Sequence, residues 1–266
     1  MVGFIGCGNM ASAIIGGILS SGFLDAGSIG VYDVLRDKTE AFAKEKGIRF
    51  FSDVKELSES CSTVILAVKP NVLPAVLSEV GTVLEKNDPL IISIAAGKTT
   101  DDIANLLPYS PRIVRIMPNI NATVCAAVSA YCGNNRITAE DKEFVEGFCN
   151  SFGKGIEIEE KLFSIYSAIG GCSPAFAYMF IDSLARGAVK NGMTKDAALK
   201  VAAQAVLGSA RMILESGEHP WKLVDAVCSP GGTTIEGVYA LEKGGMRAAV
   251  MDALAATIEK TYKLSK

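Results

Sequence analysis

The 266-residue chain is predicted to fold as an α/β protein, with an N-terminal doubly wound sheet followed by an all-helical domain. Two observations predict this. Short β-rich runs alternate with helical patterns of roughly ten residues in the first part, which is typical of βαβ units and a parallel sheet. Prolines are absent between Ala175 and His219 and after Pro230, where the sequence has helical periodicity almost throughout. We therefore expect two domains, residues 1–160 and 161–266.

The first domain is built from seven expected strands and the helices that connect them. Right-handed connections of this kind give helices on both faces of the sheet. The expected strands are 2–5, 30–33, 48–51, 63–68, 90–94, 112–117 and 127–131. The expected helices are 11–20, 36–46, 72–84 and 139–151.

The second domain contains five helical patterns. The first starts at Ser173 as N-cap, with proline in its first turn, and ends at Asn191-Gly192, where glycine can adopt a left-handed conformation. The second starts at Thr194 as N-cap and stops at Gly217. The other three are expected from residue 220, from residue 233 and over 246–264.

Composition and charge exclude several classes of protein. A hydrophobic fraction of 49% is enough for a packed core and excludes intrinsic disorder. The 26 basic and 29 acidic residues give a net charge of −3 without a basic cluster, so we expect no nucleic-acid partner. No apolar run approaches the roughly 18 residues of a membrane span, and the first strand leaves no room for a signal peptide. We expect a soluble, cytoplasmic protein with no membrane contact.

The seven cysteines and the single histidine limit the chemistry. The cysteines form no CxxC pair, and we expect reduced thiols that serve as small hydrophobic residues. His219 precedes a proline, as a residue at a helix start would. We therefore predict no metal site and no mechanism that depends on a catalytic histidine.

The segment Gly6-Cys7-Gly8-Asn9-Met10-Ala11 follows an expected strand and opens an expected helix. It has the G-x-G-x-x-A pattern of dinucleotide-binding loops. Gly6 permits the tight turn, Gly8 lets the pyrophosphate approach the backbone, and Ala11 allows close packing of helix on strand. The helix N-terminus adds N–H groups and a positive dipole.

Asp33 at the end of the second strand is placed to accept hydrogen bonds from the adenosine ribose, which favours NADH. Arg36 and Lys38 follow closely and could pair with the 2′-phosphate of NADPH instead. A purely structural interpretation makes Asp33 a helix cap and Arg36 a solvated charge. The cofactor is therefore NADPH or NADH.

Two later strand ends belong to the same predicted site, because open α/β sheets bind ligands beyond the carboxyl ends of their strands. They are Ala67-Val68-Lys69-Pro70 and Ala95-Ala96-Gly97. Small residues there let a ribose or nicotinamide lie against the backbone. Ordinary strand-to-helix turns would explain the same residues.

The segment Ser229-Pro230-Gly231-Gly232-Thr233-Thr234 also allows two interpretations. A helix N-terminus after two glycines suits a carboxylate ligand. Alternatively, Thr233 and Glu236 form a capping box after a plain turn.

The motifs in this order resemble the pyrroline-5-carboxylate reductase family, which catalyses the last step of proline biosynthesis. They are Gly3 to Ala11, Ala67 to Pro70, Ala95 to Gly97, Met117-Pro118-Asn119 and Cys228 to Ile235. The resemblance spans the chain. It implies a Rossmann-type domain, a helical dimerisation domain, a homodimer that can gather into a larger ring, and reduction of pyrroline-5-carboxylate.

The resemblance also assigns the site residues. Ser229 and Thr234 contact the substrate as catalytic residues, and backbone N–H groups of Gly231, Gly232 and Thr233 hold its carboxylate. The resemblance and the strand-end arguments above together give the expected cofactor contacts: Gly6, Cys7, Gly8, Asn9, Met10, Ala11, Asp33, Arg36, Ala67, Val68, Lys69, Pro70, Ala95, Ala96, Gly97 and Asn119. The chain departs from the family pattern at 119–122 and 171–176, where Asn-Ile-Asn-Ala and Gly-Cys-Ser-Pro-Ala-Phe occur.

Two other functions are weighed against reduction of a cyclic imine. A β-hydroxyacid dehydrogenase would need a lysine near residues 170–178, but the nearest lysine that follows is Lys190. A non-catalytic NAD(P)-sensing protein would leave the 229–234 segment without a purpose.

Overall fold

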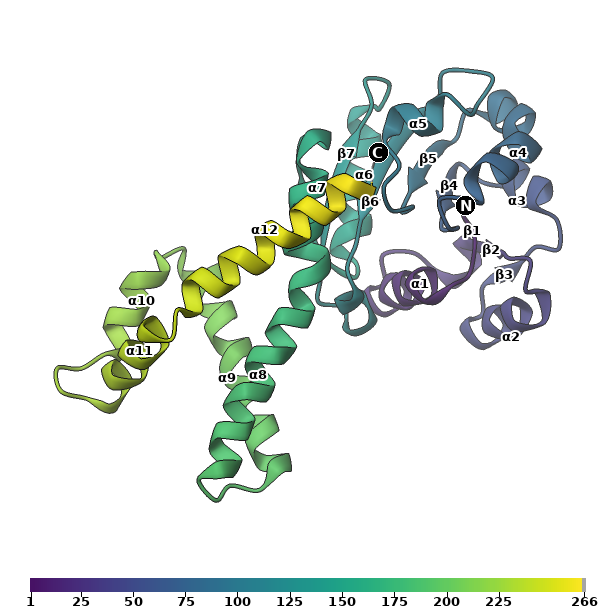
Figure 1. The fold of residues 1–266 in the computed structure, drawn as a ribbon. Helices are drawn as coiled ribbons and strands as arrows, with labels where there is room; N and C mark the ends of the chain where they lie inside the picture. Colours follow the sequence, from purple (N-terminus) through teal and green to yellow (C-terminus); the bar gives the residue numbers. More distant parts are fainter. Residues whose placement is uncertain (265–266) are drawn as a thin grey trace. The chain divides into compact units, whose positions relative to one another are not determined.

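The computed structural model describes residues 1–264, which divide into two compact units (Figure 1). Unit 1 is Met1–Gly171 together with the described end of the chain from Thr261, and unit 2 is Cys172–Lys260. The units therefore divide after Gly171. The predicted domain boundary at residue 160 stays a prediction.

Unit 1 contains a sheet of eight strands in the order β3-β2-β1-β4-β5-β6-β7-β8. Every neighbouring pair is parallel except β6 with β7. This is the predicted Rossmann-type architecture, with strand order reversing at β1. The strands are β1 (Val2–Ile5), β2 (Ile29–Tyr32), β3 (Arg49–Phe50), β4 (Thr63–Leu66), β5 (Leu90–Ser93), β6 (Arg112–Met117), β7 (Ala127–Gly133) and β8 (Gly153–Glu157).

Helices cover both faces of this sheet, which explains why its central strands β1, β4 and β5 are buried at every position. Phe4 packs into one core and the next residue, Ile5, into the other, since successive side chains of a strand point to opposite faces. The first core includes residues of α1 (Asn9–Ser21), α2 (Arg36–Lys46) and α6 (Ala139–Asn150). The second includes residues of α3 (Val54–Ser60), α4 (Leu73–Asn87) and α5 (Thr100–Ala104).

The far end of the sheet differs from the sequence prediction. β7 runs antiparallel to β6 because only the short 3-10 turn η2 (Ile120–Val124) joins them, and a parallel connection needs a longer crossover. The edge strand β8 was not predicted. Its sequence Gly-Lys-Gly-Ile-Glu is largely exposed, has no apolar run, and contains only one of the usual β-forming residues, Ile156.

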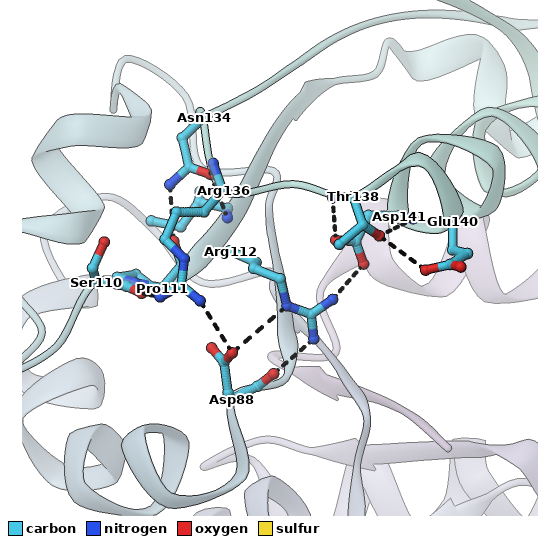
Figure 2. Close-up of polar contacts among 10 residues, drawn as sticks. Asp88, Ser110, Pro111, Arg112, Asn134, Arg136, Thr138, Glu140 and Asp141 are labelled. Atoms are coloured by element: carbon cyan, nitrogen blue, oxygen red, sulfur yellow. Dashed lines mark hydrogen bonds and ion pairs between the residues drawn. The ribbon is translucent and has the colours of Figure 1, made fainter.

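The amino end of β6 is held by a cluster of charged and amide side chains (Figure 2). Arg112 Nη1 donates to Asp141 Oδ1 at 2.6 Å and its Nη2 donates to the Asp88 carbonyl at 2.7 Å. Arg136 lies on the other side of Asp88, with 3.5 Å between Nη2 and Oδ2. These contacts join α4, β6 and α6 at the edge of the sheet opposite the carboxyl ends of its parallel strands.

Unit 2 is helical. It follows the short elements η3 (Glu160–Leu162), α7 (Phe163–Tyr166) and the π-helical turn η4 (Ser167–Cys172). The helices are α8 (Ser173–Lys190), α9 (Lys195–Ser216), α10 (Pro220–Val227), α11 (Thr233–Lys243) and α12 (Met246–Leu264), the last belonging to unit 2 up to Lys260.

Most predicted helix ends of unit 2 are confirmed. Thr194 is the N-cap residue of α9, Gly217 ends it with φ of 64°, and Gly192 follows α8 with φ of 99°. The prediction for Ser173 is wrong: Cys172 occupies the N-cap position, and Ser173 is the first residue of α8. The reason is that the π-helical turn leads directly into α8, so no extended residue precedes it.

The helices of unit 2 leave large apolar side chains exposed. The exposed fraction is 71% for Met179, 84% for Leu214 and 70% for Met251. By length and composition alone, α9 could also cross a membrane, and 11% of its most apolar stretch is buried. Its sequence contains Lys200, Gln204 and Arg211, so it is not a continuous apolar run of the kind that was expected to be absent.

The cysteines behave as predicted at four positions, where Cys7, Cys61, Cys132 and Cys149 are buried. Burial raises the pKa of the Cys149 thiol to about 12, so this thiol stays protonated and inert. The exposed Cys125 departs from the prediction.

Candidate functional site

Gly6 is a glycine because the fold of unit 1 requires it. It has φ of 106°, which side chains of L-residues rarely adopt, and its N–H donates to the Tyr32 carbonyl at 2.7 Å. A Cβ atom on Gly6 would lie 2.6 Å from the carbonyl oxygen of Ala67. Gly6 thus brings the carboxyl ends of β1, β2 and β4 close together.

Gly8 has a different explanation. Its φ of −75° is open to any residue, and apart from its chain neighbours and the backbone of its own helix, no heavy atom of the described residues lies within 4 Å of where its Cβ would be. It is the N-cap residue of α1 and contributes no side-chain cap within residues 1–264. Space above Gly8 and the N–H groups of the first turn fit a pyrophosphate, so the residues present fit a dinucleotide.

The other residues of this loop are positioned by packing. Ala11 is 1% exposed in the core under α1, as expected for close packing of helix on strand. Cys7 is buried, Met10 packs against the same core, and Asn9 is exposed at the start of the helix.

Asp33 connects the phosphate loop to the turn after β2. Its Oδ2 accepts the Cys7 N–H at 2.7 Å and its Oδ1 accepts the Leu35 N–H at 3.0 Å. Leu35, not Asp33, is the N-cap residue of α2, so the helix-cap interpretation is wrong. Arg36 is exposed, but its Nη2 donates to the Ser52 carbonyl at 2.8 Å. The contacts of Asp33 and Arg36 with a ribose stay predictions.

The structure brings the other predicted cofactor segments to the same edge of the sheet. β4 and β5 follow β1 in the sheet, and Ile5 pairs with Leu66, which pairs with Ser93. The loops that leave these strand ends, 6–11, 67–70 and 95–97, therefore emerge side by side. Lys69, Ala96 and Gly97 are exposed there, and Gly97 has φ of 75°.

Asn119, just after β6, is 5% exposed, and both polar atoms of its side chain form hydrogen bonds within the protein. Its Nδ2 donates to the Gly170 carbonyl at 2.9 Å, and its Oδ1 accepts the Asn121 N–H at 3.2 Å. Asn119 thus fixes the π-helical turn η4, and its predicted contact with the cofactor stays a prediction.

A second polar contact near this edge was not predicted as part of the site. Arg115 of β6 forms an ion pair with Glu160 at 3.2 Å and lies over the Phe163 ring, 4.2 Å from its centroid. The residues next to Glu160 in the sequence do not indicate that it pairs with Arg115, so this contact could not be predicted from a local pattern.

In unit 2, the residues predicted to bind the substrate form a tight turn before α11. Gly231 has φ of 65°, and the Gly232 N–H donates to the Ser229 carbonyl at 3.0 Å. A Cβ atom on Gly232 would lie 2.4 Å from Ser229 Oγ, so the serine hydroxyl sits against the helix start. Ser229 and Thr234 are both exposed.

The capping-box interpretation of Thr233 and Glu236 is wrong. Gly232 is the N-cap residue of α11, Thr233 is already inside the helix, and no side-chain cap is found within the described chain. The first N–H groups of α11 are thus left without an intrahelical acceptor and can hold an anion.

His219 is the N-cap residue of α10, and its Nδ1 accepts the Trp221 N–H at 3.3 Å. The prediction that His219 lies at a helix start is confirmed. Within residues 1–264, no group of three or more His, Cys, Asp or Glu side chains could hold a metal ion.

Comparison with known proteins matches both units to described families. Residues 160–264 match the family described as pyrroline-5-carboxylate reductase dimerisation, and residues 1–97 match NADP oxidoreductase coenzyme F420-dependent. The pyrroline-5-carboxylate reductase of Escherichia coli is 44% identical over 265 residues, covering 100% of this chain and 98% of that protein. The chain belongs to the pyrroline-5-carboxylate reductase family.

Other members of the pyrroline-5-carboxylate reductase family support this result. The enzyme of Methanosarcina acetivorans is 38% identical, over 100% of this chain and 98% of its own length. The Coxiella burnetii structure matches with a TM-score of 0.94 and 33% identity, covering 100% of this chain and 98% of that chain. The Plasmodium falciparum structure, which has NADP bound, matches with a TM-score of 0.86 and 32% identity, with the same coverage.

Proposed function

We propose that this protein reduces 1-pyrroline-5-carboxylate to L-proline with NADPH or NADH, the last step of proline biosynthesis. The observation that carries the proposal is the full-length relationship to pyrroline-5-carboxylate reductases, at 44% identity to the Escherichia coli enzyme. The open N-termini of α1 and α11 agree with it, since the reaction needs a place for a pyrophosphate and a place for a carboxylate.

The dinucleotide is held by unit 1. The N–H groups at the start of α1 and the space above Gly8 receive the pyrophosphate, and Asp33 receives the adenosine ribose. The loops 67–70 and 95–97 line the rest of the same edge. The bound nicotinamide supplies the hydride, so the protein has to bind and orient the two reactants and to exclude water from them.

The substrate carboxylate is held by unit 2, where the N–H groups of Gly232 and Thr233 begin α11. Ser229 and Thr234 present hydroxyl groups at this helix start. The Thr234 hydroxyl fixes the ring nitrogen and thereby orients C5 for hydride attack, which is a positioning contribution to the rate.

The chemistry needs no strong acid from the protein. The imine nitrogen is protonated before attack, which makes C5 electrophilic, and after hydride addition the product amine keeps that proton. This agrees with a chain whose single histidine already accepts a backbone N–H at a helix start.

The protein assembles as a homodimer through residues 160–264 and works in the cytoplasm. The match to a dimerisation domain and the exposed apolar side chains of α8, α9 and α12 support the dimer. Such a partner surface, rather than a membrane, is our explanation for the apolar character of α9. Association of dimers into a larger ring is part of the same proposal.

The test is a spectroscopic assay with purified protein. We expect absorbance of NADPH or NADH to fall only when pyrroline-5-carboxylate is added, with L-proline appearing in equal amount. Binding of nucleotide without turnover would favour a sensing protein. Reduction of NAD(P)+ by a β-hydroxyacid, with no reaction of the imine, would favour the dehydrogenase alternative.

A further inference from the structure

Glu160 lies at the centre of a hydrogen-bond network in unit 1. Its Oε1 accepts the Thr100 N–H at 2.8 Å and Arg115 Nη1 at 3.2 Å, while its Oε2 accepts the Thr100 hydroxyl at 2.9 Å. The Glu160 carboxylate, in η3, thus binds both the N–H and the hydroxyl of Thr100. Thr100 is the first residue of α5 and lies sixty residues earlier in the chain.

Thr100 is the anchor of the predicted cofactor loop 95–97. It follows Gly97 by three residues and is 5% exposed. The other end of the loop is held by β5, where the Ile94 N–H donates to the Leu66 carbonyl at 3.1 Å and the Ala95 N–H donates to Ser93 Oγ at 3.3 Å. Gly97 has φ of 75° and, among the described residues, would have open space around a Cβ atom. The loop is therefore free to vary only between two fixed ends.

The position of Glu160 is in turn fixed by its ion pair with Arg115. The Arg115 side chain is 10% exposed and lies over Phe163, so its charge is held in a mostly buried place. A guanidinium in that position strongly favours a charged partner. Glu160 cannot turn into solvent without leaving Arg115 unpaired, and this keeps its carboxylate on Thr100.

We infer that Glu160 is a positioning residue for the dinucleotide: it holds the 95–97 loop in the conformation that receives the cofactor. The inference rests on the proposed function, because the loop is a cofactor contact only if that proposal holds. Glu160 does not contact the reacting atoms. Its contribution is preorganisation, so its loss weakens dinucleotide binding and leaves the substrate end unchanged.

The test uses the full-length enzyme and three variants. Glu160→Ala removes all three contacts. Glu160→Gln keeps an oxygen for the Thr100 N–H and an amide that can donate to the Thr100 hydroxyl. Glu157→Ala is the matched control, since Glu157 lies nearby in the chain and pairs with exposed Lys142 at 2.9 Å. The dissociation constants of NADPH and NADH are measured without imine, followed by kcat and both KM values.

Glu160→Ala should raise the dissociation constant and KM of the dinucleotide about tenfold, with kcat and the KM of the imine changed less than about twofold. Glu160→Gln should recover binding to within about threefold of the natural enzyme, and Glu157→Ala should not differ from it. If Glu160→Ala does not fold, Thr100→Val provides the measurement, with an expected weakening of about threefold from the lost hydroxyl contact alone.

Unchanged dinucleotide binding in a folded Glu160→Ala enzyme would overturn the inference. An equal rise in both KM values would overturn it too, since a general loss of structure acts on both ligands. These outcomes are separate from failure of the proposed function, which the natural enzyme reveals by lacking imine reduction even where it binds the dinucleotide.

Discussion

Two pairs of helices in this protein begin in contrasting ways. α1 and α11 start after a glycine and have no side-chain cap within the described residues. α5 and α6 start with complete capping boxes, Thr99 with Asp102 and Thr138 with Asp141. In α5 the Thr100 N–H is taken as well, by Glu160.

This contrast distinguishes helix starts whose N–H groups are used for stability from helix starts whose N–H groups can bind a ligand. A capping side chain stabilises a helix by about 1 kcal/mol, and it also occupies the N–H groups that an anion would need. Both helix starts where our proposal places the pyrophosphate and the substrate carboxylate lack a side-chain cap within the described residues, a property that they share with α2, α4, α8 and α9. In α5, the helix that follows β5, the capping box and Glu160 occupy the N-terminal N–H groups. Any cofactor contact at this strand end must therefore come from the loop 95–97 that precedes α5.

The two open helix starts also differ from each other. Gly8 has empty space where a Cβ would be, whereas a Cβ on Gly232 would collide with Ser229 Oγ. Nothing in the described residues requires glycine at position 8, and our proposal explains it by the pyrophosphate, while the neighbouring serine explains glycine at position 232.

Gly8→Asp should convert the open start of α1 into a closed one. The protein has room for the side chain, and aspartate is a favourable N-cap, so the melting temperature should not fall. The carboxylate would occupy and repel the pyrophosphate, so we expect the dissociation constant of NADPH to rise about a hundredfold or more. Equilibrium binding and thermal unfolding are measured on the same preparation.

Gly6→Ala is the control for Gly8→Asp. Its φ of 106° and the nearby Ala67 carbonyl predict a loss of stability of about 2 kcal/mol or more. A Gly8→Asp enzyme that binds NADPH normally would show that glycine at position 8 does not serve a ligand.

Thr234→Ala tests the open start of α11. We expect kcat to fall about tenfold or more, while the dissociation constant of NADPH changes little, because the hydroxyl acts on the substrate. Thr233→Ala is the matched control: the residue is also exposed, and its proposed contribution, a backbone N–H, survives the substitution. Equal losses in both variants would assign the effect to the helix start rather than to the Thr234 hydroxyl.

Asp33→Ser tests the residue beside the open start of α1. Removal of the negative charge should shift the ratio of KM values toward NADPH by about fivefold, since a carboxylate repels a 2′-phosphate. Affinity for both nucleotides should also fall, because the Cys7 N–H loses its acceptor. A fall in affinity with an unmoved ratio would leave Asp33 only its contact with the phosphate loop.

Much of this comparison could be foreseen from the sequence where the pattern was local. Gly6 and Gly8 lie between an apolar strand and a helical pattern, and this spacing in this position predicts a glycine-rich start of α1. The helix starts at Thr194 and His219 are likewise local patterns, and both are confirmed.

The contacts that could not be predicted join residues far apart in the chain. Glu160 reaches Thr100 across sixty positions, and Asn119 reaches Gly170 across fifty-one. β8 escaped prediction because an exposed edge strand does not need an apolar pattern. The Thr233–Glu236 pattern misled because it has the spacing of a capping box, while the backbone places the N-cap one residue earlier, at Gly232.

Asp102→Asn gives the smallest expected effect and tests a closed helix start. The Thr99 N–H, which donates to the Asp102 carboxylate at 2.9 Å, lowers the pKa of that carboxyl below its usual value. A lowered pKa in the folded state means that the charge stabilises the protein at neutral pH and stops doing so as the pH falls through that pKa. Solvent exposure keeps the effect small, about 0.5 kcal/mol near pH 7.

Thermal unfolding should therefore show a slightly lower melting temperature for Asp102→Asn at neutral pH. The gap to the natural protein should close as the pH falls below about 4, where the unfolded carboxyl is already protonated. Asp101→Asn is the control, since that residue lies in the same first turn but does not belong to the capping box. A gap that stays constant with pH would assign the stabilisation to the shape of the Asp102 side chain and not to its charge.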